Sequence, residues 1–275
     1  ALGQTLADRG HDVEIYHAMQ FMEPLISDLP ETLAADGIER VIAVPIYPLC
    51  GPSTTVSSID SLEDAIGEES GFDPEFTAIT GWHRAPIYNR LRAEGIESFL
   101  EEEGLDPNDP ETTFVFSAHG TPTKYLDEGS RYDQYVDEHA EAVAGMVGIA
   151  EYEIGYQNHA NRGIEWTDPE TEDVVVGLEG EAEQVIVEPM SFMHEQSETL
   201  VELDVDLADD AAEVGIELFR VPVPHDDPRF PDLLADVAEP FLSGFAPSYY
   251  QLRQCQCRNK EGTFCFNAEL PPQAN

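Results

Sequence analysis

Positive charge is scarce in this chain: 13 Lys and Arg residues stand against 56 Asp and Glu, which gives a formal net charge of −43 over 275 residues. Partners such as nucleic acid and anionic membranes require a basic surface, so the composition excludes both. The carboxylates are spread along the whole chain instead of forming one tail. Such a surface is typical of a protein from a halophilic organism, because high salt screens the self-repulsion within a few ångströms.

Long apolar runs are missing as well. No stretch approaches the ~20 apolar residues of a membrane-spanning helix, and no basic segment followed by an apolar one opens the chain. We therefore expect a cytoplasmic protein without an integral membrane segment. The chain opens inside an amphipathic helical pattern at residues 1–7, and we expect a further segment to precede it. Disorder is excluded because 41% of the residues are hydrophobic and lie in periodic blocks.

Runs that favour strands alternate with helical patterns along the chain, for example the strand-like run 112–118 and the helical pattern 195–214. A strand is also predicted at residues 13–16. Alternation of this kind predicts parallel sheets wound by right-handed crossovers. The sequence thus indicates an α/β protein with two doubly wound, Rossmann-like parallel-sheet domains.

Composition also predicts the domain boundaries. A Pro- and Asp-rich break at residues 103–111 follows a long helical pattern, so we expect an N-terminal domain of residues 1–105 and a C-terminal domain of residues 106–245. The tail, residues 246–275, has no clear periodicity and carries three of the four cysteines.

Candidate chemistry lies at two strand ends. The apolar run from Thr112 stops at His119, and the run 184–189 stops shortly before His194 and Glu195. Ligands of open parallel sheets bind beyond the carboxyl ends of the strands, so we expect the two ends to face one cleft. Imidazole serves there as a metal ligand and as a base that titrates at about pH 6.5.

A helix after Glu195 would place Glu198, Glu202 and Asp206 at i, i+4 and i+8 on one stripe, with His194 one turn before Glu198. A row of hard oxygen ligands that ends at imidazole suits the passage of a hydrated divalent ion or of protons. A solvated helix face explains the same pattern in so acidic a chain. The position beside a strand end favours the functional interpretation.

These residues resemble a family, the ferrochelatases, which insert ferrous iron into a porphyrin. The run Phe116 to Gly120 resembles the family's catalytic-histidine motif, and the run Pro189 to Leu200 resembles its Pro-x-x-Phe-x-x-(Asp/Glu)-His-x-Glu-x-Leu motif. The resemblance is collinear over about residues 1–243. It implies two domains of the class II chelatase type, the first of them truncated here.

The resemblance also implies roles for individual residues. His119 and Glu198 are the expected catalytic pair, and the expected metal ligands are His119, Glu198, His194, Glu195, Glu202 and Asp206. Gln196 stands where the family usually has histidine, which makes His194 a candidate substitute. The expected porphyrin contacts are Tyr47, Ser53, Thr54, Gln157, Trp166, Phe192 and Met193.

The cysteines pose a separate question. Cys255, Cys257 and Cys265 crowd the tail, and Cys50 follows a strand end. In a cytosolic protein such a group suggests a metal before a disulfide. Four thiolates resemble the set by which some ferrochelatases hold a [2Fe-2S] cluster, and zinc or thiols without a metal remain alternatives.

The sequence therefore predicts a ferrochelatase that acts on protoporphyrin IX or coproporphyrin III, with ferrous iron as its second substrate. Two alternatives remain open at this point. One is a cobalt or nickel chelatase for sirohydrochlorin, which shares the chelatase architecture. The other is a non-catalytic protein that binds a porphyrin or an iron-sulfur cluster.

Overall fold

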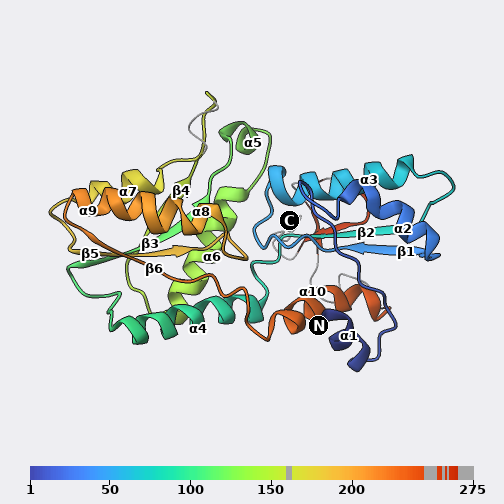
Figure 1. Ribbon diagram of the computed structural model, residues 1–275, viewed down its shortest axis with the longest axis horizontal. Helices are drawn as coiled ribbons and strands as arrows, with labels where there is room; N and C mark the ends of the chain where they lie inside the picture. The colour runs from blue at the N-terminus through green and yellow to red at the C-terminus, as the bar shows by residue number, and fades with distance from the viewer. Residues whose placement is uncertain (159–162, 245–252, 256–257, 259, 266–275) are drawn as a thin grey trace, which may run out of the picture. The chain divides into compact units, whose positions relative to one another are not determined.

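The computed structural model describes residues 1–158, 163–244, 253–255, 258 and 260–265. The chain forms two compact units, the first made of Ala1–Ala85 with Pro228–Asn275 and the second of Pro86–Asp227. Each unit is a β-sheet between helices (Figure 1). Within the described residues, no helix is both long and apolar enough to cross a membrane.

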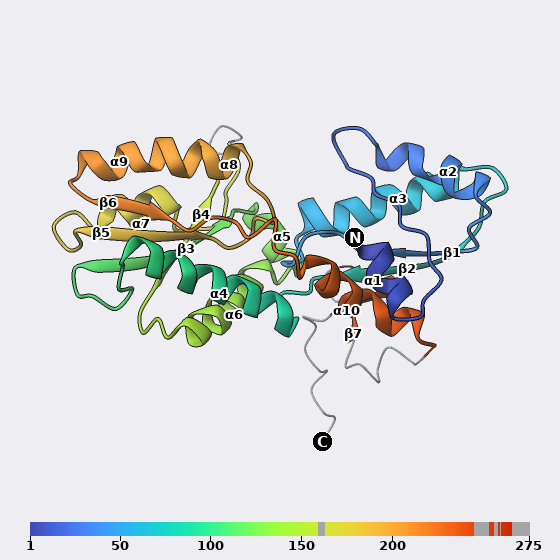
Figure 2. The ribbon, with the colours of Figure 1, turned by 60° about the horizontal axis from the view of Figure 1, so that its bottom comes forward.

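The first unit contains a mixed sheet in the order β1-β2-β8-β7, in which only the β7–β8 pair is antiparallel. Its strands are β1 (Arg40–Ala43), β2 (Glu75–Thr80), β7 (Arg253–Gln254) and β8 (Thr263–Cys265). Helices α2 and α3 lie over one face, and α1 and α10 lie over the other (Figure 2). The helices of this unit are α1 (Leu2–Asp8), η1 (Ile26–Asp28), α2 (Leu29–Ala35), the π-helical turn η2 (Pro52–Val56), α3 (Ser57–Glu68) and α10 (Phe230–Leu242).

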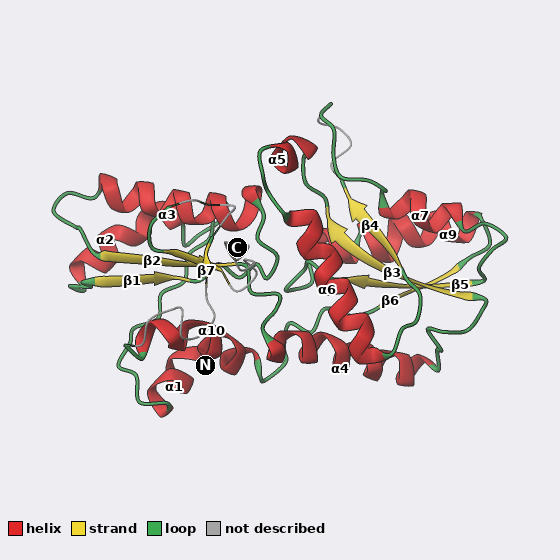
Figure 3. Ribbon diagram, turned by 180° about the vertical axis from the view of Figure 1, so that it is seen from behind, coloured by secondary structure: helices red, strands yellow, loops and turns green. Residues whose placement is uncertain are grey.

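The second unit contains a fully parallel sheet in the order β4-β3-β5-β6. Its strands are β3 (Thr112–His119), β4 (Glu153–Gln157), β5 (Gln184–Pro189) and β6 (Glu217–Arg220). Helices α4 and α6 lie over one face, with α7, α8 and α9 over the other (Figure 1 and Figure 3). The helices of this unit are α4 (Pro86–Glu103), α5 (Thr123–Asp127), α6 (Tyr132–Val147), α7 (Thr171–Gly177), α8 (Ser197–Leu200), the π-helix η4 (Glu202–Leu207) and α9 (Ala208–Glu213).

The central strands β3 and β5 explain why the sheet of the second unit was visible in the sequence. Phe114 to Ala118 are all buried, as are Val185 to Pro189, because helices cover both faces of a parallel sheet. Val115, Val187 and Leu203 belong to one buried cluster that joins the sheet to η4. The predicted fold class is thereby confirmed.

The boundaries of the units differ from the predicted domains. Helix α4 belongs to the second unit, where it packs on α6, so the break at residues 103–111 is a loop inside that unit. The chain returns to the first unit at Pro228, and α10 packs on α1. The described part of the predicted tail is not separate either, because β7 and β8 pair into the first sheet. Composition marks loops, whereas packing decides which unit a helix belongs to.

Two local predictions also differ from the structure. Residues 13–16 form no strand, since alternating polarity alone supplies no partner strand for the backbone. The helical pattern 195–214 begins only at Ser197, and it is divided into α8, the π-helix η4 and α9. A stripe of side chains at i and i+4 fits both α- and π-helix, so the pattern does not reveal the π segment.

Candidate functional site

His119 ends the central strand β3, and its backbone is held on both sides. The amide of His119 donates to Ser191 Oγ at 2.7 Å, and the hydroxyl of Tyr132 donates to the carbonyl of His119 at 2.8 Å. The ring nitrogen Nδ1 lies 2.7 Å from the carbonyl oxygen of Gly120. A carbonyl only accepts, so we assign the hydrogen of the neutral ring to Nδ1. Nε2 therefore presents a lone pair.

Glu198 faces this lone pair. It lies in the first turn of α8, and its Oε1 is 3.6 Å from Nε2 of His119. The side chains are 32% and 21% exposed for His119 and Glu198, so both are open to a ligand. Phe192 packs nearby, with its ring centroid 6.4 Å from that of His119. A base and a carboxylate thus face each other beside an apolar ring.

Gln157, at the end of the neighbouring strand β4, connects the sheet to the acidic stripe. Its amide nitrogen donates to the carbonyl of Glu198 at 2.8 Å and to Oε2 of Glu202 at 3.2 Å. Its amide oxygen accepts from Ser117 Oγ at 3.0 Å. Gln157, a predicted substrate contact, is buried, and both the nitrogen and the oxygen of its side-chain amide are hydrogen-bonded to protein groups. We therefore assign it to positioning of the stripe.

The stripe continues into a pocket of about 180 Å³. Glu202 and Asp206 line this pocket together with Glu170, Glu172 and Asp210. Partial burial and the neighbouring carboxylate of Asp210 raise the pKa of Glu172. The predicted row of acids therefore leads from His119 into a strongly negative pocket of the second unit.

Glu195, one of the predicted metal ligands, accepts hydrogen bonds from several protein groups. Arg220 Nη1 donates to both of its oxygens, at 2.9 and 3.1 Å. Thr199 Oγ1 and the amide of Val223 donate to them as well, at 2.7 and 2.9 Å. Burial alone raises the pKa of Glu195, but these hydrogen bonds outweigh it and lower the pKa. We assign Glu195 to the scaffold because protein donors occupy its carboxylate.

The remaining predicted site residues are divided between the two units. His194 is exposed, and Gln196 caps α8 in a capping box with Thr199. Phe192 is buried, and Trp166 and Met193 are half-buried in the second unit. Tyr47, Ser53 and Thr54 lie in the first unit, after β1 and in η2.

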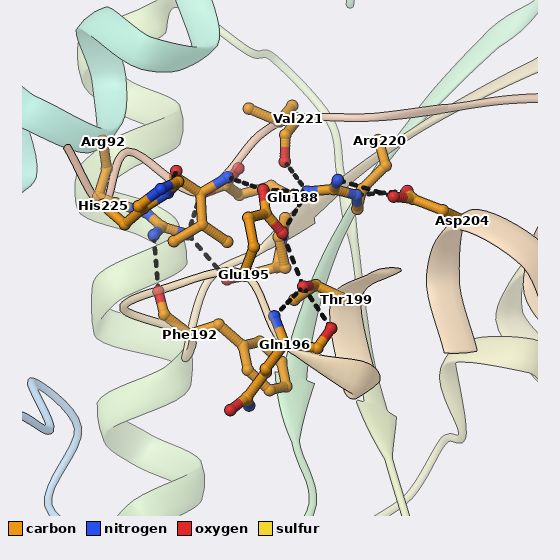
Figure 4. Close-up of polar contacts among 12 residues, drawn as sticks. Arg92, Glu188, Phe192, Glu195, Gln196, Thr199, Asp204, Arg220, Val221 and His225 are labelled. Atoms are coloured by element: carbon orange, nitrogen blue, oxygen red, sulfur yellow. Dashed lines mark hydrogen bonds and ion pairs between the residues drawn. The ribbon is translucent and has the colours of Figure 1, made fainter. Parts of the chain in front are cut away.

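A buried ion pair was missed from the sequence. Arg92 of α4 pairs with Glu188 of β5, and their side chains are 1% and 2% exposed. The same guanidinium donates to the carbonyl of Pro189 at 2.8 Å. It also donates to the carbonyl of Phe192 at 3.0 Å (Figure 4). It thereby fixes the turn that leads from β5 to the site. The only sequence signal is a carboxylate inside the apolar run Val185-Ile-Val-Glu-Pro189.

The cysteines lie in the first unit. Cys50, Cys255 and Cys265 are buried and, among the described residues, form no disulfide. Cys255 donates its amide to the carbonyl of Thr263, which places it beside β8. Within the described part of the chain, no group of three or more His, Cys, Asp and Glu residues could hold a metal ion. Cys257 lies outside the described residues.

The fold, two sheets wound by helices, is similar to that of solved chelatase structures. SirB from Bacillus subtilis with Fe³⁺ matches with a TM-score of 0.61 and 13% identity, over 91% of this chain and 89% of that one. CbiX, the terminal enzyme for biosynthesis of sirohaem in denitrifying bacteria, matches with a TM-score of 0.52 and 16% identity, over 83% of each chain. At these identities the likeness shows the fold alone.

The sequence comparisons are more specific. The family model of ferrochelatase matches residues 1–241, and the chain belongs to this family. The ferrochelatase of Nostoc punctiforme is 34% identical over 243 residues, which cover 86% of this chain and 61% of that protein. The ferrochelatase of Geotalea uraniireducens is 32% identical over 246 residues, or 88% of this chain and 76% of that protein. The chain thus spans about three-fifths of the length of the Nostoc relative.

Proposed function

We propose that this chain inserts ferrous iron into a porphyrin. The observation that carries the proposal is the facing pair of His119 Nε2 and Glu198 Oε1, 3.6 Å apart at the end of β3. The reaction requires a base for the macrocycle and an anionic group near the entering cation. Relatives of this chain are named ferrochelatase, which supports the same conclusion.

His119 is the proposed base. Insertion forms iron–nitrogen bonds and releases the two pyrrole N–H protons, without any transfer of electrons. The lone pair on Nε2 accepts a pyrrole proton, because Nδ1 already donates to the carbonyl of Gly120. The imidazolium that forms is then paired with the carboxylate of Glu198. Phe192 supplies an apolar surface beside the ring, which suits a flat macrocycle.

The acidic stripe is the proposed route for iron and protons. Glu202 follows Glu198 at i+4, and Asp206 follows in the pocket of the second unit. Carboxylate oxygens bind a hydrated divalent cation weakly enough to release it, which delivery to a nitrogen ligand requires. The amide of Gln157 holds Glu202 in line with this route.

Anaerobic metallation tests the proposal directly. His119→Ala and Glu198→Gln should each lose nearly all iron insertion, followed by the absorbance change of the porphyrin. Glu213→Gln, an exposed carboxylate of α9, is the matched control and should retain activity. Wild-type activity in either site variant would remove that residue from the mechanism.

The choice of macrocycle is part of the same assay. Protoporphyrin IX and coproporphyrin III are the proposed substrates, and sirohydrochlorin with cobalt or nickel is the comparison arm. SirB and CbiX share the fold, but this chain pairs a histidine with a glutamate at the strand end. Insertion of metal into sirohydrochlorin alone would show that the protein is a sirohydrochlorin chelatase instead. Binding without insertion of any metal would favour a porphyrin-binding protein.

A [2Fe-2S] cluster on Cys50, Cys255, Cys257 and Cys265 remains a proposal. Its support is the burial of three of these thiols in the first unit and the amide of Arg258, which donates to Cys255 Sγ at 3.3 Å. Hydrogen bonds to sulfur are among the features that tune such clusters. Anaerobically purified protein should then be coloured and contain iron and labile sulfide. Colourless protein with stoichiometric zinc would assign the thiols to zinc instead.

We further propose that the protein works in the cytoplasm of a halophilic organism. The support is the dispersed charge of −43, which is screened best at high ionic strength. The same charge argues against nucleic acid as a partner.

A further inference from the structure

The π-helix η4 is an uncommon conformation that needs something to hold it. Its wide turn is visible in the backbone, where the amide of Asp206 donates to the carbonyl of Val201 at 2.9 Å. This segment directly follows α8 and includes Glu202. The position of the acidic stripe therefore depends on whatever keeps the backbone in this register.

Arg220, the last residue of β6, binds the segment at both ends of α8. Its Nε and Nη2 donate to the carboxylate of Asp204 at 2.5 and 2.8 Å, and Nη1 donates to that of Glu195 (Figure 4). The side chain of Arg220 is 9% exposed, whereas those of Glu195 and Asp204 are 18% and 34% exposed. The planar, rigid guanidinium of Arg220 thus joins Glu195, which precedes α8, to Asp204 inside η4.

The opposite edge of the sheet holds the same segment through Gln157. Strands β6 and β4 are the two outer strands of this sheet, and Arg220 and Gln157 stand at their ends. Gln157 binds the carbonyl of Glu198 and the carboxylate of Glu202. Residues of both outer strands therefore hold the segment. Gln157 binds Glu198 and Glu202, whereas Arg220 binds Glu195 and Asp204.

We propose that Arg220 is a positioning residue for the acidic stripe. By binding Glu195 and Asp204 together, it holds residues 202–207 in the π-helical register and keeps Glu202 beside Gln157 and Glu198 opposite His119. The effect of Arg220 on the backbone of residues 202–207 is inferred from these contacts alone. Its effect on metal insertion rests on the proposed function.

Release of the partly exposed arm at Asp204 would allow the segment to return toward the commoner α-helix. A change from the wide π-helical turn to an α-helical turn rotates the side chains about the helix axis, so the side chain of Glu202 would move away from Gln157. The arm at Glu195 is better shielded and shared with Thr199 and Val223. The weak point of the arrangement is therefore Asp204.

Amide hydrogen exchange and kinetics on the full chain test this proposal. The variants are Asp204→Asn, which removes one arm, and Arg220→Lys, which keeps the charge but cannot span two carboxylates. Asp209→Asn is the matched control, since it removes an exposed carboxylate of α9. Asp204→Glu restores the charge and is the rescue variant.

We expect amides 203–207 to exchange about tenfold faster in Asp204→Asn and Arg220→Lys, with the amides of β3 unchanged. Asp209→Asn should match the wild type, and Asp204→Glu should recover part of the protection. Iron insertion should show a lower kcat at an unchanged KM for porphyrin. Unchanged exchange in residues 203–207, or equal acceleration in β3, would overturn the proposal. An inactive wild type would refute the proposed function alone, because the exchange still decides the role of Arg220.

Discussion

Arg92 and Glu188 offer a quantitative test of how the second unit holds its site. The pair is buried, with 1% and 2% exposure of the side chains. Removal of one partner of a buried pair costs about 3–5 kcal/mol, because it leaves an uncompensated charge. Arg92→Met and Glu188→Met should therefore each lower the free energy of unfolding by about this amount.

The double variant separates charge from packing. It leaves no buried charge, so the remaining cost comes from the carbonyl of Phe192, which loses the donor of Arg92, whereas the carbonyl of Pro189 still accepts from the amide of Phe192 at 3.2 Å. An unpaired buried acceptor costs about 1–3 kcal/mol. The single effects sum to about 6–10 kcal/mol, whereas the double variant loses about 1–3 kcal/mol, so it should be more stable than that sum predicts by at least about 3 kcal/mol.

Amide hydrogen exchange in β3 and β5 measures the opening free energy of the second unit by itself. The matched control is Arg40 and Glu75 of the first unit, a pair at 3.4 Å with 42% and 68% exposure, whose coupling should stay below about 1 kcal/mol. Additivity within about 0.5 kcal/mol for Arg92 and Glu188 would refute the reasoning. The pair would then not interact as a buried ion pair.

Three further predictions concern pH, packing and salt. The pKa of Glu195 is lowered in the folded state, so its stabilisation is present above its unfolded pKa of about 4.3 and is lost as pH falls further. Glu195→Gln should therefore be less stable at neutral pH, and the difference in urea midpoint should shrink only as pH falls below about 4.3. Gly155→Ala would place a Cβ 2.7 Å from Cα of Thr171, so its Tm should fall by several degrees, which is about 1–3 kcal/mol. The unfolding midpoint of the wild type should rise between about 0.1 M and 1 M KCl, since the Debye length falls from about 10 to 3 Å; an unchanged midpoint would contradict the interpretation of the surface charge.

The sequence predicts the parts of this structure that local pattern controls. His119 is placed correctly at a strand end because a buried parallel strand is a mostly apolar run, and His119 is the first ionisable side chain of this one. Glu198 is placed near it because the ends of parallel strands share one edge of the sheet. The same logic fails for Arg92, which lies in a helix and finds Glu188 only through packing. It fails likewise for α4, whose assignment to the second unit depends on contacts with α6.

The acidic residues of the site cannot be told apart from the sequence, but the arginines that pair with some of them reveal different roles. With 13 Lys and Arg for 56 acids, most carboxylates of this chain have no basic side chain to pair with. Two arginines nevertheless lie at the segment that carries the site, where the buried Arg92 pairs with Glu188 and the half-buried Arg220 pairs with Glu195. Both oxygens of Glu195 accept from Arg220, which commits this acid to the scaffold. Glu198 instead faces the imidazole of His119, and under the proposed function this carboxylate takes part in proton transfer or meets the entering cation.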